Sequence, residues 1–241
     1  MKNPRISIQG IKGSFHDQAA HGFFGKDHQT IDCVSFKQTC VALDKKEADF
    51  AVMAIENSIA GSLLPNYALL QDHNLSIVGE IYLPIRLYLM GLKGVNFEDI
   101  KYVQSHPIAI RQCVEFFEEF PDKQLLEKND TAACAKEIVD KQLTDTFAIA
   151  GEHTAEMYNL EIKERRIEKT SRNFTRFLIL KKEGEQNTDE NNNKATLCFH
   201  VHSKVGSLSK ALNIFAENDL NLTKIQSTPV IGHPEKSNFF I

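Results

Sequence analysis

The chain has 241 residues, of which 42% are hydrophobic, and its formal net charge at neutral pH is −4. Such a length suits one large or two small domains with a sizeable core, and the slightly acidic balance argues against a nucleic-acid partner, since no basic stretch stands out. Five cysteines without a CxxC spacing indicate reduced thiols of a cytoplasmic protein. We find no secretory signal at the N-terminus and no apolar run long enough to cross a membrane.

The first third of the chain alternates short apolar segments with amphipathic ones. The pattern predicts strands over 5–8, 31–34 and 50–53 and helices over 15–24, from about 36 and over 63–70. Ser14 follows a glycine turn and is the expected N-cap of the first helix. Residues 76–90 are rich in β-formers but contain Gly79 and Pro84, which predicts two strands.

The middle of the chain repeats this alternation. It predicts strands over 101–103 and 147–150 and helices over 106–119 and 131–139, with Ser105 and Asp130 as the expected caps. Short strands alternating with helices predict an α/β sheet, and ligands of such sheets bind at the carboxyl ends of the strands. Two α/β halves would leave a cleft between them, and we expect the second half over about residues 79–160.

A polar segment separates this region from the C-terminal one. Residues 183–193 lack large apolar side chains and cannot support a core, so we expect a linker there. Beyond it the pattern predicts a strand over 195–201, a helix over 206–217 and strands over 220–230 and from 237. This β-α-β-β order suits a ferredoxin-like α+β module without its final helix and strand. We therefore divide the chain into domains over 1–182 and 194–241.

Three polar segments carry candidate chemistry, and each has an ordinary explanation. Residues 56–58 (Glu-Asn-Ser) follow an apolar strand, where α/β ligands bind, but they also suit a simple Asx turn. Residues 105–107 (Ser-His-Pro) are a common helix start, although free N–H groups there attract carboxylates. Thr175 and Arg176 lie between two aromatic residues, a pattern found most often in protein cores.

No pattern in the sequence calls for a cofactor or a metal. Gly10 and Gly13 match neither the Walker loop nor the dinucleotide fingerprint. His200 and His202 would share one face of a strand, but no further metal ligands accompany them. We therefore expect chemistry that uses no cofactor.

Taken together, the order of the motifs resembles that of the prephenate dehydratases. The segments that carry the resemblance, over about residues 5–180, are Gly13-Ser14-Phe15, Ile55-Glu56-Asn57-Ser58, Gly79-Glu80, Ser105-His106-Pro107 with Gln112-Cys113, Ala155-x-x-Tyr158 and Asn173-x-Thr175-Arg176-Phe177. The C-terminal module resembles an ACT domain, an amino-acid-sensing unit. Its two motif positions are occupied by Val205-Gly206-Ser207-Leu208 and Gln226-Ser227-Thr228-Pro229.

The resemblance implies a lyase with a two-lobed catalytic domain like that of the periplasmic binding proteins. The reaction it implies is the conversion of prephenate to phenylpyruvate, with loss of carbon dioxide and water, in phenylalanine biosynthesis. Because forming an aromatic ring drives this reaction, the enzyme needs only a donor for the leaving hydroxyl, anchors for the dianion and a dry site. By similarity, Thr175 is catalytic and interacts with that hydroxyl. The implied substrate-binding residues are Ser14, Glu56, Asn57, Ser58, Ser105, His106, Gln112, Arg176 and Phe177.

Two of these side chains have open roles. Arg176 either binds a carboxylate of the substrate with two hydrogen bonds or braces the site from behind. Glu56 would repel a dianionic substrate unless it is protonated or turned away.

The ACT resemblance implies feedback inhibition by phenylalanine, bound between paired modules of a homodimer or homotetramer. The residues implied for this regulatory site are Gly206, Ser207, Leu208, Gln226, Ser227 and Pro229. Two departures weaken the expectation, since Thr228 replaces the arginine of the second motif and the module stops at Ile241.

Two alternatives to prephenate dehydration stay open. A two-lobed fold also describes solute-binding proteins, which bind without turnover, although the missing signal peptide argues against a periplasmic role. Within the enzyme class, arogenate is an alternative substrate, because it differs from prephenate only in having an amine in place of the keto group. No chorismate mutase segment precedes the motifs, so we expect a monofunctional enzyme.

Overall fold

The computed structural model describes residues 3–182, 193–230 and 232–241. The chain divides into two compact units, residues 1–186 and 187–241, and we describe each by itself. The linker expected over 183–193 lies, apart from residue 193, outside the described residues. None of the described helices is long and apolar enough to span a bilayer.

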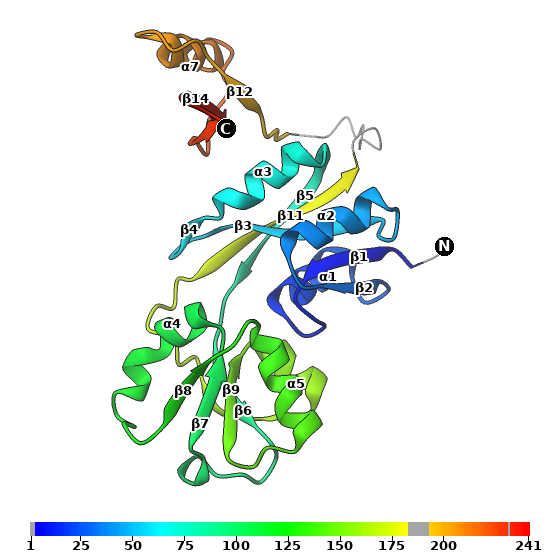
Figure 1. Ribbon diagram of the computed structural model, residues 1–241, viewed down its shortest axis with the longest axis vertical. Helices are drawn as coiled ribbons and strands as arrows, with labels where there is room; N and C mark the ends of the chain where they lie inside the picture. The colour runs from blue at the N-terminus through cyan, green and yellow to red at the C-terminus, as the bar shows by residue number, and fades with distance from the viewer. Residues whose placement is uncertain (1–2, 183–192, 231) are drawn as a thin grey trace. The chain divides into compact units, whose positions relative to one another are not determined.

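The larger unit contains two α/β lobes, as predicted, and the first is built on a mixed sheet (Figure 1). The order of its main strands is β2-β1-β3-β11-β5, with β4 paired to β3. The strands are β1 (Arg5–Gln9), β2 (Gln29–Cys33), β3 (Phe50–Asn57), β4 (Gly61–Ser62), β5 (Leu75–Pro84) and β11 (Phe174–Lys182), and the helices are α1 (Phe15–Phe24), α2 (Phe36–Asp44) and α3 (Leu64–Asp72). Strands β1, β2 and β3 are parallel, whereas β11 runs antiparallel to both β3 and β5.

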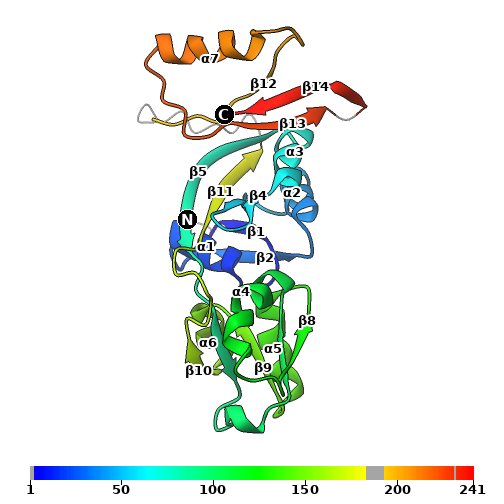
Figure 2. The same cartoon turned by 90° about the vertical axis from the view of Figure 1, so that its left-hand side faces the viewer.

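The helices of the first lobe cover both faces of its sheet. Helix α1 packs on β3 and β5. Helices α2 and α3 contact each other, α2 packs on β1 and β3, and α3 packs on β3 and β5 (Figure 2). The connection from β1 to β2 and the connection from β2 to β3 run in opposite directions across the sheet. Because both are right-handed, their helices α1 and α2 lie on opposite faces. The predicted cap of α1 is confirmed, because the Ser14 hydroxyl accepts a hydrogen bond from the Asp17 N–H at 3.3 Å.

The second lobe has a sheet of order β10-β6-β9-β7-β8. Its strands are β6 (Tyr88–Gly91), β7 (Tyr102–Ser105), β8 (Gln124–Glu127), β9 (Thr146–Ala150) and β10 (Glu161–Arg165), and its helices are η1 (Phe97–Asp99), α4 (Pro107–Phe117), α5 (Thr131–Lys141) and α6 (Glu152–Tyr158). The lobe begins later than the expected residue 79, because Gly79 does not break β5. Instead Gly79 lies under the ring of Phe23, and β5 continues in the first sheet to Pro84.

The expectation that Ser105 caps α4 is wrong. Strand β7 extends to Ser105, which pairs with Glu127 of β8, and the buried Ser105 hydroxyl donates to the Ile149 carbonyl at 2.6 Å. His106 is the N-cap instead, and its Nδ1 accepts from the Ile108 N–H at 3.2 Å. The strand is longer than predicted because its neighbours β8 and β9 supply partners that sequence patterns do not reveal.

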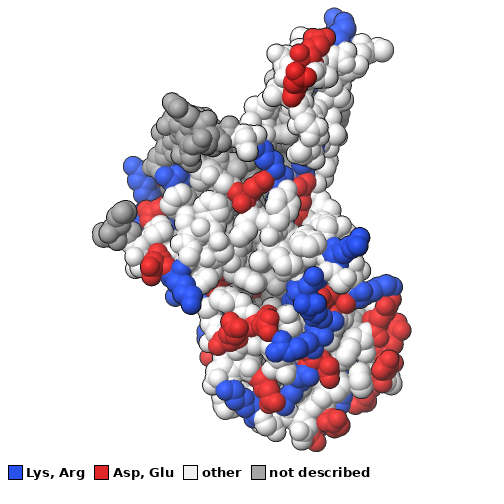
Figure 3. Space-filling view, turned by 180° about the vertical axis from the view of Figure 1, so that it is seen from behind, with Lys and Arg blue, Asp and Glu red and all other residues white. Residues whose placement is uncertain are grey.

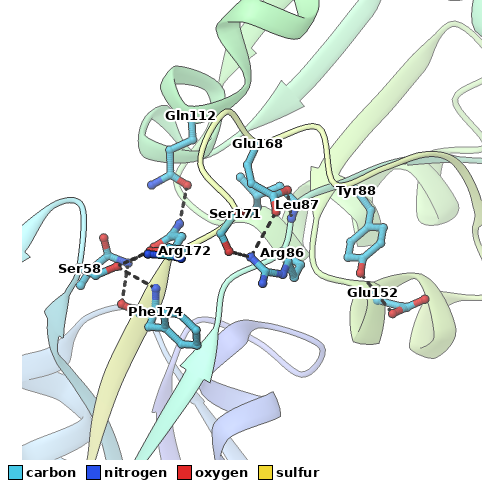
Figure 4. Close-up of polar contacts among 12 residues, drawn as sticks. Ser58, Arg86, Leu87, Tyr88, Gln112, Glu152, Glu168, Ser171, Arg172 and Phe174 are labelled. Atoms are coloured by element: carbon cyan, nitrogen blue, oxygen red, sulfur yellow. Dashed lines mark hydrogen bonds and ion pairs between the residues drawn. The ribbon is translucent and has the colours of Figure 1, made fainter.

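Two segments, one before β6 and one after β10, connect the lobes and are tied together. The Leu87 N–H donates to the buried carboxylate of Glu168 at 2.9 Å, and the Leu87 carbonyl accepts from the Ile167 N–H at 3.0 Å. The Arg86 guanidinium donates to the Ser171 carbonyl next to them (Figure 4). The two segments that connect the lobes are therefore hydrogen-bonded to each other.

Acidic and basic side chains intermingle over the second lobe on the face that Figure 3 shows. Several acidic side chains adjoin along the right-hand edge of the lobe in this view, next to basic ones.

The smaller unit has the predicted β-α-β-β order. Its elements are β12 (Cys198–His200), α7 (Ser207–Glu217), β13 (Gln226–Val230) and β14 (His233–Phe240). The three strands form an antiparallel sheet of order β12-β14-β13. Strand β13 begins at residue 226 and not at the expected 220.

Close packing in the second lobe provides a test of this fold. A Cβ at Gly91 of β6 would come within 2.2 Å of the ring of Phe147, which is fully buried and cannot move aside. We expect Gly91→Ala to lower the free energy of unfolding by about 1–3 kcal/mol, measured by urea denaturation. Gly22→Ala is the control, because its Cβ would meet only the mobile end of Ile81 and a helix favours alanine. Equal stability of the two variants would contradict the packing.

Candidate active site

A cavity of about 500 Å³ opens between the two lobes of the larger unit. Its lining residues are Gln9, Ser14, Phe15, His16, Phe36, Ala54, Asn57, Ala60, Leu63, Thr175 and Phe177 of the first lobe, His106, Ile108, Ala109, Gln112, Asn129, Asp130 and Thr131 of the second, and Ile85, Leu87 and Asn173 of the connections. The parallel strands β1, β3, β7 and β8 all end near it, so the cavity lies at the carboxyl edge of both sheets.

The Thr175 hydroxyl is held by an amide whose orientation is determined by its other bonds. The side-chain oxygen of Asn57, Oδ1, accepts hydrogen bonds from the Ile59 and Ala60 N–H groups at 3.0 and 2.8 Å. Its NH₂ group therefore faces β11 and donates to Thr175 Oγ1 at 2.9 Å and to Asn173 Oδ1 at 2.7 Å. Because Thr175 accepts this bond, its own hydroxyl hydrogen can point to a ligand in the cavity.

The same network reaches the second lobe. Asn173 is fully buried and donates to Gln112 Oε1 at 3.0 Å. Figure 4 shows Gln112 extending from α4 toward the segment that carries Arg172 and Phe174. Since the side-chain oxygen of Gln112 accepts the hydrogen bond from Asn173, the side-chain NH₂ group of Gln112 can serve as a neutral donor at the cavity.

Thr175 and Arg176 point to opposite faces of the sheet, as successive residues of a strand do. Thr175 and Phe177 line the cavity, whereas Arg176 lines a smaller hollow of about 290 Å³. There its guanidinium donates to Glu80 at 2.7 Å and to Glu56 at 3.1 Å, and only 8% of Arg176 is exposed. Arg176 thus lies on the side of the sheet away from the cavity, which favours the bracing role over contact with the substrate.

A β-bulge turns Glu56 away from the cavity. Strand β11 pairs Arg176 with Glu56 but Phe177 with Ala54, which leaves Ile55 as an extra residue in β3. In a regular strand Ala54 and Glu56 would share a face. With the bulge, Ala54 faces the cavity and Glu56 meets Arg176 on the other side. In this geometry the carboxylate of Glu56 is turned away from the cavity.

Several of the residues expected at the site do line the cavity together with Thr175. They are Ser14, Asn57, His106, Gln112 and Phe177. Glu56, Ser58, Ser105 and Arg176 are absent from its described lining. The hydroxyls of the two serines have backbone partners, which are the Ile149 carbonyl for Ser105 and the Arg172 carbonyl and Phe174 N–H for Ser58.

Two neutral histidines form part of the cavity wall. His16, which our sequence interpretation missed, packs edge-on to Phe177 with ring centroids 5.0 Å apart, and burial lowers its pKa to about 3. The only local signal for it was its place in the first turn of α1. Burial also lowers the pKa of His106, whose Nδ1 accepts a backbone N–H, so the proton of the neutral ring is on Nε2.

The cavity can hold anions without a basic side chain. No lysine or arginine is among the described residues that line it. Helices α1 and α4 begin at the lining residues Ser14 and His106, and the positive ends of helix dipoles favour negative charge. The start of α5 differs, because the carboxylate of Asp130 already caps it. Across the described ranges, no cluster of three His, Cys, Asp or Glu side chains is placed to hold a metal.

The residues expected to bind phenylalanine lie in two places in the smaller unit. Ser207 and Leu208 line a hollow of about 410 Å³ at the start of α7, next to Gly206, the N-cap of that helix. Gln226, Ser227 and Pro229 lie in β13, at an edge of the sheet. Within one copy of the chain, no described contact joins the two groups.

Comparisons with known proteins agree on one family. The family model for prephenate dehydratase matches residues 6–185. Arogenate dehydratase/prephenate dehydratase 2, a chloroplastic protein of Arabidopsis thaliana, is 36% identical over 236 residues, which are 97% of this chain and 61% of that protein. The chain spans about three fifths of the length of the curated relatives it matches.

Two solved structures have similar folds. Prephenate dehydratase from Arthrobacter aurescens in complex with L-Phe has a TM-score of 0.84 at 25% identity, covering 98% of this chain and 79% of that one. GqqA, described as a novel type of quorum quenching acylase, has a TM-score of 0.85 at 29% identity, covering 98% and 85%.

The buried ion pairs of Arg176 predict a structural role that can be measured. Arg176→Met would remove the cation that pairs with both Glu56 and Glu80, and we expect it to lower the free energy of unfolding by about 3 kcal/mol. Arg165→Met is the matched control, because the exposed pair of Arg165 and Glu152 should contribute less than about 1 kcal/mol. Urea denaturation of both variants checks this, and undiminished stability of Arg176→Met would refute the bracing role.

Proposed function

The chain belongs to the prephenate dehydratase family, and from this premise we propose that it converts prephenate to phenylpyruvate, with loss of carbon dioxide and water. The observation that carries the proposal is the Thr175 hydroxyl, which Asn57 holds as an acceptor so that it can donate into the cavity. The leaving oxygen of prephenate needs such a donor.

The proposed reaction needs only weak assistance from an acid, because formation of the aromatic ring drives it. As the bond to the departing carboxylate breaks, its electron pair enters the ring, the ring becomes aromatic and the bond to the hydroxyl oxygen breaks. That oxygen leaves as water once it has gained a proton. A threonine hydroxyl is too weak an acid to supply the proton unaided at neutral pH, so Thr175 orients the leaving oxygen or relays a proton to it.

The apolar wall favours the loss of the carboxylate. The lining residues Phe15, Phe36, Ile85, Leu87 and Phe177 offer no hydrogen bonds from their side chains. A charged carboxylate loses its solvation against such a wall, whereas neutral carbon dioxide needs little solvation. A dry surface therefore favours decarboxylation. The other carboxylate of the substrate would be held by neutral donors at the helix starts.

An acylase reaction is less well supported by the same site. A threonine nucleophile needs a base in contact with its hydroxyl. The contact of Thr175 is the amide of Asn57, which is not basic, and the pKa of the nearby His16 is lowered to about 3 with its Nε2 toward the Ala54 N–H. This arrangement favours a donor over a nucleophile.

We further propose that the smaller unit is an ACT-type module through which phenylalanine inhibits the enzyme. The β-α-β-β order and the hollow beside Ser207 and Leu208 support this, as does the phenylalanine complex of the Arthrobacter relative. In the proposed arrangement two copies of the chain pair, so that Ser207 of one copy and Ser227 of the other can contact one ligand.

Removing the Thr175 hydroxyl provides the main test of the proposed reaction. We expect Thr175→Ala to lower kcat for prephenate by roughly 10²- to 10⁴-fold, the usual scale for lost acid–base assistance. Thr175→Ser is the control and should retain most of the rate, because it keeps the hydroxyl. The measurement is phenylpyruvate formation at neutral pH. A folded Thr175→Ala variant with near-normal turnover would refute the role of the Thr175 hydroxyl.

Regulation is tested separately from catalysis. Increasing phenylalanine should progressively lower the initial rate with prephenate, whereas aspartate, which lacks the ring, should not. The rate of phenylpyruvate formation is again the readout. An unchanged rate at saturating phenylalanine, with an oligomeric protein, would refute the regulatory proposal and leave the catalytic one intact.

A further inference from the structure

The cavity contains a group that can distinguish the two substrates of this family. Prephenate and arogenate share a ring hydroxyl and two carboxylates, and they differ at one position, a keto group in prephenate and an ammonium in arogenate. A residue that separates them must therefore respond to a positive charge. This inference rests on the proposed function and concerns the substrate of the same site.

Asp130 is the one carboxylate among the described residues that line the cavity. One of its oxygens, Oδ1, accepts the Ala133 N–H at 2.7 Å and so caps α5. The other, Oδ2, lies against Gly10 of the first lobe, where an added Cβ would be 2.7 Å away. The carboxylate thus stands where the two lobes approach each other.

Other acids strengthen the negative potential at this end of the cavity. Burial raises the pKa of Asp32, and the charges of Asp17 and Asp130 raise it further, although the charge and backbone N–H of Lys12 oppose them. Burial also raises the pKa of Asp130. A carboxylate that has lost solvation in this way gains by pairing with a cation, and it repels a further anion.

The position of Asp130 suits the shape of the substrate. The hydroxyl leaves from the ring carbon opposite the one that bears the side chain, so the two reacting ends need separate surroundings. Thr175, Asn57, Asn173 and Gln112 form one set of hydrogen bonds, and the described hydrogen bonds of Asp130 do not join it. A substrate whose hydroxyl contacts Thr175 of the first lobe can present its side chain to Asp130 of the second lobe, because both residues line the cavity.

We propose that Asp130 is a specificity-determining residue, which pairs with the ammonium of arogenate and so favours this amino acid over the keto acid prephenate. Capping of α5 does not by itself require a charge, because serine, threonine and asparagine cap helices as well as aspartate does. Asp130→Asn therefore keeps the size and the cap of the side chain and removes only its charge.

The test compares the two substrates in one set of variants. We expect Asp130→Asn to lower the ratio of kcat/KM for arogenate to kcat/KM for prephenate by roughly 10- to 100-fold, the scale of a lost charged hydrogen bond. The value for prephenate should be unchanged or higher. Asp32→Asn removes a neighbouring charge that does not line the cavity, and we expect it to change the ratio less than about threefold.

Three results would separate this inference from the proposed function. An equal loss of kcat/KM with both substrates in Asp130→Asn would overturn the specificity role. Turnover of prephenate alone by the unsubstituted chain would also overturn it, but this result would support the proposed function. Turnover of neither substrate would contradict the proposed function. In that event the thermal shift induced by arogenate decides, because stabilisation that is equal in the unsubstituted chain and in Asp130→Asn would overturn the role of Asp130.

Discussion

The antiparallel pairing of β11 with β3 is the constraint on which the site depends. It sets Thr175 opposite Asn57 and Arg176 opposite Glu56, although more than a hundred residues separate the partners. Because side chains alternate across a strand, the same pairing sends the hydroxyl into the cavity and the guanidinium to the back of the sheet. A slip of one residue would exchange these two groups.

The back of the sheet explains why such a slip is disfavoured. Arg176 is almost fully buried and shares its donors between Glu56 and Glu80, which come from the strands on either side of β11. A shifted register would take the buried guanidinium of Arg176 away from both carboxylates, at a cost of several kcal/mol. The ion pairs therefore stabilise the one register in which Thr175 faces the cavity.

Among the described residues, the lining of the cavity combines neutral donors and apolar walls with one acidic side chain, Asp130. The amide of Asn57 holds the Thr175 hydroxyl, and the two histidines of the lining are neutral near pH 7 because burial lowers their pKa. Such surroundings hold an anion without the strong pairing that would stabilise a departing carboxylate. Hydrogen bonds between the two connecting segments keep both lobes in place around this cavity.

The sequence by itself determined the features that depend on neighbours along the chain. The helix starts at Ser14 and Asp130, the two α/β lobes and the β-α-β-β order were all predicted from local patterns, since caps and periodicity involve residues only a few positions apart. The tertiary structure alone decided where the side chains point. The bulge at Ile55, the burial of Ser105 and the pairing of Arg176 with Glu56 and Glu80 depend on strand partners far away in the chain, and no local pattern encodes the register in which distant strands meet.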